Sequence, residues 1–118
     1  MTRAGKGTPP SSTRRVGRPP LPVVWTDRAL RDIEAIGDHI GRDSPAAASS
    51  WVARLCRAAE KAGVAPLGGR CVPELGRQDI REMFLRTYRI VYLVTAEQVV
   101  ILTVFEGHRL FPPEADPH

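Results

Sequence analysis

Four side chains in the second half of the chain have the chemistry that RNA cleavage through the 2′-hydroxyl requires. That reaction needs a base for the hydroxyl, cations around the phosphorane charge and an acid for the leaving oxygen. A carboxylate, two guanidinium groups and an imidazole are supplied by Glu74, Arg81, Arg89 and His108. Arginine suits the phosphate because its planar guanidinium makes bidentate contacts. These four residues are therefore candidate catalytic residues.

Ordinary structural roles are also open to these residues. Glu74 lies in a loop, where it could pair with Arg70 or Arg77. Arg89 falls within a predicted strand, and a charged residue on the exposed face of a sheet is common. His108 at a strand end is equally compatible with a solvated side chain. The residue types alone therefore do not establish an active site.

A second candidate site is the segment 106–113, which follows the last predicted strand. Here His108, Arg109, Leu110 and Phe111 are close together in the sequence. Exposed apolar residues beside a cation often mark a site for a partner protein. The alternative is that the two apolar residues cover the edge of the sheet. We take the four residues as candidate target-binding residues.

Two helices are predicted in the first half of the folded part. Apolar residues recur at steps of three and four over residues 27–42, and Thr26 is suited to cap that helix. Ser44 followed by Pro45 favours the start of a second helix, which ends in the glycine-containing region 63–69. Trp51 falls in the apolar stripe of this second helix and is predicted to belong to the core.

Strands are predicted at residues 23–25, 80–85, 88–95 and 98–105, where apolar and β-branched residues gather. The connections between the last three are short enough to be hairpins, so these strands should be antiparallel neighbours. The last strand is apolar on both faces and should be the most buried. The order predicts an α+β fold, β-α-α-β-β-β, with a helical hairpin packed on a small, mostly antiparallel four-stranded sheet.

The basic charge of the chain is concentrated at its N-terminus. Residues 1–22 contain 5 of the 17 basic residues and none of the 13 acidic ones, so the remainder has 12 basic and 13 acidic residues and a net charge of −1. The basic pI therefore does not indicate a nucleic-acid-binding domain. We predict a disordered tail at 1–22, either a solvated extension or a basic arm, then a single domain at 23–113 and a flexible C-terminus at 114–118.

The cysteines and the hydropathy indicate a reduced compartment. Cys56 and Cys71 are not a short-spaced pair and have no neighbouring histidine at metal-ligand spacing. No apolar run reaches 18 residues, and the N-terminus lacks the apolar stretch of a signal peptide. We therefore expect a cytoplasmic protein without a bound metal or cofactor and without a membrane partner.

Residues 23–109 resemble the ParE/RelE toxin superfamily of type II toxin–antitoxin systems, and within it ParE most closely. The resemblance is carried by VVWTDRALRDIEAI from residue 23, D-S-P at 43–45, G-R-C-V-P-E at 69–74, I-R-E at 80–82 and Y-R-I-V-Y at 88–92. The motif residues are Gly69, Arg70, Pro73, Glu74, Arg81, Glu82, Tyr88, Arg89 and Tyr92.

The resemblance implies a toxin that a co-expressed antitoxin neutralises by binding along the helical hairpin and sheet, so that the two form a hetero-oligomer. ParE-like members inhibit DNA gyrase by binding it, without catalysis. RelE-like members cleave messenger RNA on the ribosome without a metal, and that alternative would make Glu74 the base, Arg89 the phosphate clamp and His108 the acid. Since one fold carries both functions, the fold alone does not decide between them.

Two features favour the gyrase inhibitor over the nuclease. Several such nucleases have a C-terminal aromatic residue that stacks on a base, whereas His108 is followed here by Arg109. The domain is also slightly acidic, while a ribosome-directed nuclease should have a positive field. A third hypothesis is an inert relative that binds an antitoxin and has no toxic activity.

Overall fold

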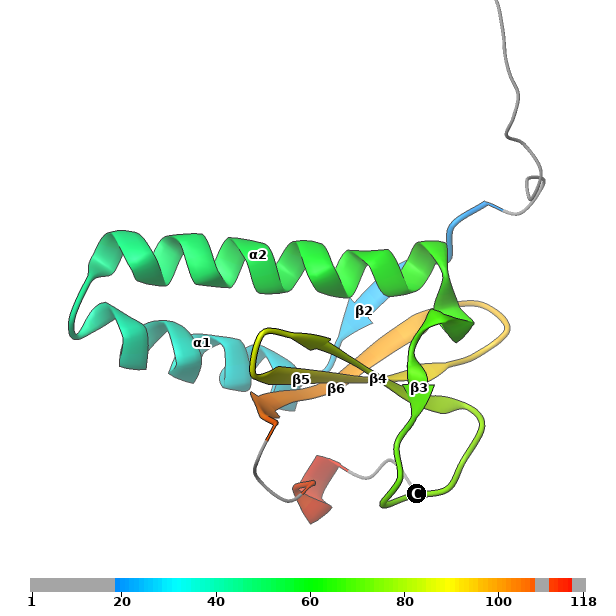
Figure 1. Cartoon of the computed structure of the whole chain (residues 1–118). Coiled ribbons are helices and arrows are strands. Elements are labelled where there is room, and N and C mark those ends of the chain that lie inside the picture. Colours follow the sequence, from blue (N-terminus) through cyan, green and yellow to red (C-terminus); the bar gives the residue numbers. More distant parts are fainter. Residues whose placement is uncertain (1–18, 108–110, 116–118) are drawn as a thin grey trace, which may run out of the picture.

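The computed structural model describes residues 19–107 and 111–115. Two antiparallel helices, α1 (Asp27–Gly41) and α2 (Pro45–Val64), lie together on one face of a five-stranded sheet (Figure 1). The predicted α+β class and the packing of the helical hairpin on one sheet face are confirmed. Of the tail predicted to be disordered at 1–22, residues 1–18 lie outside the described residues.

The sheet has the strand order β2-β6-β5-β4-β3. Its strands are β2 (Val23–Trp25), β3 (Arg70–Cys71), β4 (Ile80–Leu85), β5 (Tyr88–Val94) and β6 (Val99–Glu106). β2 pairs with β6 in parallel, and the other neighbours are antiparallel. The predicted number of four strands is wrong because β3 forms a fifth. Two residues are too few to show the alternation by which a strand is recognised.

Both helices begin at the residues that the sequence indicates. The side chains of Thr26 and Ser44 accept hydrogen bonds from the backbone N–H groups of Ala29 and Ala47, at 3.0 and 3.1 Å. The Thr26 hydroxyl lies 2.9 Å from the carbonyl oxygen of Ile101 and donates to it. This residue therefore fixes the start of α1 to the inner strand β6, and both predicted caps are confirmed.

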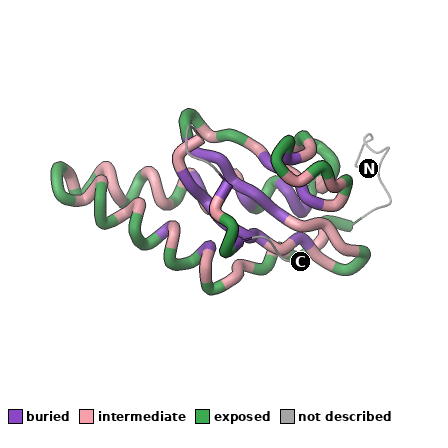
Figure 2. The backbone as a smooth tube through the Cα atoms, turned by 90° about the horizontal axis from the view of Figure 1, so that it is seen from below, coloured by how far each residue is buried: buried purple, intermediate pink, exposed green. Residues whose placement is uncertain are grey.

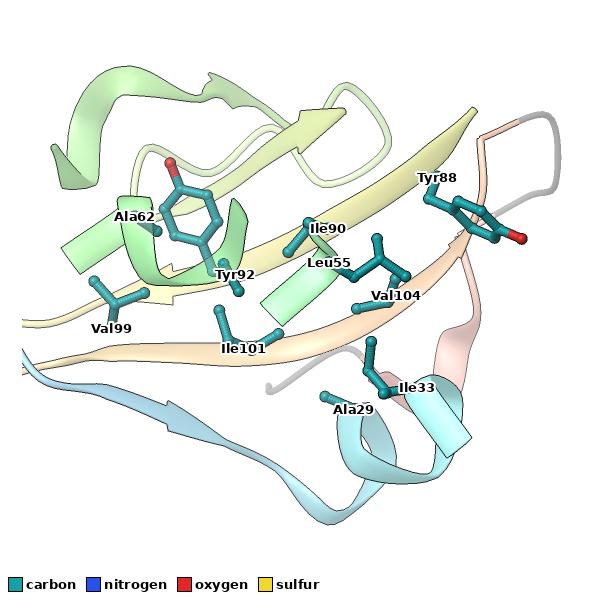
Figure 3. Packing of buried hydrophobic residues seen from close by; sticks show 11 residues of the cluster. Ala29, Ile33, Leu55, Ala62, Tyr88, Ile90, Tyr92, Val99, Ile101 and Val104 are labelled. Carbon is teal, nitrogen blue, oxygen red and sulfur yellow. The ribbon is translucent and has the colours of Figure 1, made fainter. Parts of the chain in front are cut away.

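The main core lies between the helices and the sheet (Figures 2 and 3). Leu55 of α2 is fully buried against strand residues that include Ile90, Tyr92 and Ile101. Tyr88 and Tyr92 share one face of β5, and both belong to this core. Every residue of β6 is buried or half-buried, so its predicted burial is also confirmed. Hydrophobic burial on both sides of the central strands stabilises the sheet.

Trp51 is only half-buried, because the helical hairpin extends beyond the sheet (Figure 2). Its ring meets Tyr88 edge to face with centroids 5.7 Å apart, and the guanidinium of Arg54 lies 4.5 Å from the ring centroid. The predicted position on the apolar stripe is correct, but the residue lies at the margin of the core.

A smaller core lies on the face of the sheet opposite the helices. It consists of Val72, Ile80, Val91, Leu102, Phe105, Phe111 and Ala115. The segment between β3 and β4 and the short 3-10 helix η3 (Pro113–Ala115) cover this face (Figure 1). Neither helix of the hairpin reaches this face, so these two segments shield its central strands from water.

The folded part is wider than the predicted range 23–113. At its N-terminal end, the N–H of Leu21 donates to the carbonyl oxygen of Gly63 at 2.9 Å, and the Leu21 side chain packs against the main core. At the other end Ala115 is buried, so residues 114 and 115 belong to the fold. Single apolar residues within polar, proline-rich segments did not signal this packing.

Candidate functional site

Four motif residues form a chain of ion pairs on the helix-free face of the sheet. Glu82 of β4 is fully buried and accepts hydrogen bonds from Arg70 on β3 and Arg89 on β5. Arg89 also holds Glu74 with two parallel hydrogen bonds of 3.1 Å. We call Arg70, Glu82, Arg89 and Glu74 the ionic quartet. Its two positive and two negative charges balance.

The registers of β3, β4 and β5 position the ionic quartet. Arg70 lies opposite Glu82 in the β3–β4 pair, and both side chains project to the same face. Arg89 of β5 lies opposite Phe84 of β4 and also projects to that face. Its guanidinium stacks on Phe105, and the guanidinium carbon is 4.9 Å from the centroid of that ring. Strand alternation therefore brings together charges that are distant in the sequence.

The quartet shifts the protonation equilibria of its members. Burial disfavours the charged form of Arg89, but hydrogen bonds to Glu74 and Glu82 outweigh burial and raise its pKa above the ordinary value. Hydrogen bonds from Arg89 lower the pKa of Glu74, against a smaller opposing effect of burial. Arg89 and Glu74 are therefore held in their charged forms. A general base works best with a pKa near the working pH, so the shift makes Glu74 a poorer base.

The pH dependence of stability should report this contact. Because the pKa of Glu74 is lowered in the folded state, its contribution should be present above the unfolded-state pKa of about 4.3 and lost as the pH falls through the folded value. In urea titrations, the stability difference between wild type and Glu74→Gln should be largest near neutral pH and shrink in acid. A difference that stays constant from neutral pH to acid would contradict the assigned ion pair.

Of the other predicted catalytic residues, Arg81 lies apart from the quartet. Its guanidinium donates to the carbonyl oxygens of Gln78 and Gly69, both at 3.0 Å, and so fixes the segments that flank β3. The structure brings Glu74 and Arg89 together in an ion pair, whereas Arg81 has a separate, structural role. His108 lies outside the described residues.

Phe111 does not lie on an exposed patch, so the structure lacks the exposed apolar side chain on which its predicted role in target binding was based. Its side chain is 8% exposed and packs edge to face on Phe105, with ring centroids 6.2 Å apart. The alternative considered from the sequence was that Leu110 and Phe111 cover the edge of the sheet, but Phe111 covers its helix-free face instead. His108, Arg109 and Leu110 are outside the described residues, so their predicted contact with a target remains a prediction.

Sequence reasoning missed the role of Glu82 and the exposure of Phe84. Both alternate with Arg81 and Met83 on β4, and this alternation alone does not show which side chains of a face are buried. Phe84 is instead 49% exposed. Its place at the end of β4, beside a hairpin turn, was the available signal.

The described residues were also compared with the patterns of a metal site and of a membrane-spanning helix. Within residues 19–107 and 111–115, no three His, Cys, Asp or Glu side chains are grouped as metal ligands would be. In the same part of the chain, neither helix is long and apolar enough to cross a membrane.

Comparison with known proteins identifies the class to which this fold and face belong. The family described as the ParE toxin of the type II toxin–antitoxin system, parDE, matches residues 23–111. Y4kP of Sinorhizobium fredii is 38% identical over 93 residues, which cover 76% of this chain and 92% of the relative. Toxin RelE2 of Caulobacter vibrioides is 39% identical over 89 residues, which cover 75% and 97%.

A solved structure has the same fold. The structure titled "Chromosomal ParDE TA system from P. aeruginosa" superposes with a TM-score of 0.62 at 20% identity and covers 73% of this chain and 95% of that chain. The helical hairpin on a small sheet is thus the fold of type II toxins of the ParE/RelE superfamily. This chain belongs to the ParE toxin family.

Proposed function

We propose that this toxin inhibits DNA gyrase by binding it, without catalysing a reaction, and that a cognate antitoxin neutralises it in the cytoplasm. Family membership supports a toxin with an antitoxin partner. The observation that favours binding over RNA cleavage is the state of Arg89. Its guanidinium is buried and engaged by two carboxylates.

A phosphate clamp must offer donors to the substrate. The Nε group of Arg89 donates to Glu82 at 2.9 Å, and both terminal amino groups donate to Glu74 at 3.1 Å. RNA would have to displace Glu74 to reach Arg89, and Glu82 would then still neutralise part of the charge. Charge stabilisation at a reacting phosphate requires donors that are already directed at it. The quartet directs these donors at protein carboxylates instead.

The order in which macromolecular syntheses stop after induction tests the proposal. The full chain would be induced in a host without the antitoxin, and DNA, RNA and protein synthesis would be followed by pulse labelling within minutes. An early fall in DNA synthesis, with inhibition of purified gyrase in a supercoiling assay, is expected. An early fall in protein synthesis would overturn the proposal in favour of messenger RNA cleavage.

Glu74→Gln should leave growth arrest within about threefold of wild type, because the side chain keeps its shape and Glu82 still neutralises Arg89. A catalytic base would behave differently, since losing it reduces a rate by about two to four powers of ten. Serial dilution of induced cells and messenger RNA primer extension would measure both effects. Loss of arrest in a folded Glu74→Gln protein would support the nuclease.

A further inference from the structure

Phe84 stands out on the helix-free face because it is an exposed aromatic residue held in one position. Five large apolar residues of the described chain are exposed, and Phe84 is the aromatic one among them. The others are Val24, Leu30, Val64 and Leu67. The guanidinium of Arg70 lies 5.6 Å from the centroid of its ring, within the range of a cation–π contact. Arg70 is in turn anchored on the buried carboxylate of Glu82.

Gly107 supports the other side of the ring. A Cβ atom at Gly107 would lie 2.9 Å from Cε2 of Phe84, so only a residue without a side chain lets the ring rest there. The N–H of Gly107 donates to the carbonyl oxygen of Thr87 and holds this backbone against the β4–β5 turn. Phe84 therefore loses little conformational freedom when a partner covers it, which favours binding.

An exposed cation borders the ring of Phe84. The Arg70 side chain is 65% exposed, whereas its partner Glu82 is fully buried, so the cation rather than the carboxylate faces solvent. In the described part of the chain, the hydrogen-bond partner of Arg70 is Glu82, which accepts from the Nε–H group and leaves the terminal amino groups available. Arg86 is exposed in the turn that follows β4. We call Arg70, Phe84, Arg86 and Gly107 the Phe84 patch.

From this arrangement we infer that the Phe84 patch is the surface by which the toxin binds its protein target, and that the target presents an apolar pocket bordered by carboxylates. This inference rests on the proposed function and names the site that carries it out. Rigid aromatic and arginine side chains dominate the binding energy of protein interfaces. A protein is favoured over a nucleic acid because the chain beyond residue 22 has 12 basic and 13 acidic residues.

The first test compares Phe84→Thr with a control, Val24→Thr, in the full chain. Threonine retains strand propensity, and Val24 is also an exposed strand residue, on β2 at the opposite edge of the sheet. Phe84→Thr should weaken inhibition of purified gyrase by about tenfold or more and reduce growth arrest in parallel. Val24→Thr should match wild type, and the melting curves by circular dichroism should show that both variants fold.

The second test addresses the chemistry of the partner. If carboxylates meet Arg70, inhibition of gyrase by wild type should weaken as salt rises, and Arg70→Gln should reduce this salt dependence. Equal salt dependence in the two proteins would overturn the acidic character of the partner. Single-stranded RNA binding that wild type shows and Phe84→Thr loses would overturn the inference in favour of a nucleic acid.

The outcomes separate this inference from the proposed function. If wild type and folded Phe84→Thr inhibit gyrase equally, the inference fails and gyrase inhibition stands. If wild type arrests growth without inhibiting gyrase, the proposed function fails. A loss of arrest in Phe84→Thr but not in Val24→Thr would then support the patch, and equal arrest would overturn it. If the wild-type chain neither arrests growth nor inhibits gyrase, both the inference and the proposed function are overturned.

Discussion

Replacing Arg89 with methionine is expected to lower the free energy of unfolding by about 3–5 kcal/mol, because removal of one member of a buried ion pair leaves the other charge uncompensated. Glu82 is fully buried and would keep Arg70 as its partner, although the Arg70 side chain is largely exposed. Domains of this size are stable by about 5–15 kcal/mol, so the variant should lie near the limit of folding.

Urea denaturation followed by circular dichroism would measure this loss. Methionine fills a similar volume and can still pack on Phe105, which keeps the loss of charge as the main change. The double variant Glu82→Leu with Arg89→Met supplies the control. Because it removes both buried charges, it should recover much of the stability that Arg89→Met loses.

The Arg89 experiment also separates the two functions. If Arg89 were free to bind a substrate phosphate, replacing it should reduce activity but change stability little. The buried ion pair instead predicts that the main effect of the replacement is a loss of stability. An Arg89→Met protein as stable as wild type would show that the charge of Glu82 is adequately compensated without Arg89, and it would remove the main argument against RNA cleavage.

The secondary structure was largely predictable because its signals are local. Thr26 and Ser44 are capping residues directly before apolar residues spaced by three and four, and the later strands follow a period of two. Short connections then determine that these strands are antiparallel neighbours. Such patterns depend on residues only a few positions apart, so one sequence contains them in full.

The arrangement of charges was predictable only in part. From the sequence, Glu74 was expected to pair with Arg70 or Arg77, which are its neighbours in the chain, but its partner is Arg89. That pairing depends on how the segment between β3 and β4 folds back across the sheet, and no local pattern determines this path. The same limit applies to Phe111, which packs on Phe105.

Family resemblance and geometry contribute different information about function. The motif around Gly69 indicates the toxin family, but it does not show whether Glu74 serves a reaction or a contact. The structure places this carboxylate in a bidentate pair with Arg89. A motif residue can therefore serve to position a surface, and here the ionic quartet holds Arg70 beside the exposed ring of Phe84.

Gly69→Ala is expected to be the second strongly destabilising change, with a loss of about 2–4 kcal/mol. A Cβ atom at this position would lie 2.5 Å from both the carbonyl oxygen of Glu82 and the hydroxyl oxygen of Tyr92. The Tyr92 hydroxyl accepts from the N–H of Gly69 at 3.1 Å and donates to the carbonyl oxygen of Pro66 at 2.9 Å. Relieving the clash would separate β3 from β4 and leave buried polar groups without partners.

The neighbouring glycine provides a matched control. At Gly68 the nearest atom to an added Cβ is the Cβ of Ala65, at 3.4 Å, which is close to an ordinary contact. Gly68→Ala should therefore change stability by less than about 1 kcal/mol and could stabilise the fold by restricting the unfolded chain. Thermal and urea denaturation of both variants would test this. Equal stability of the two would mean that β3 moves freely, and since Arg70 follows Gly69 directly, such freedom would also remove the rigid support that the Phe84 patch requires.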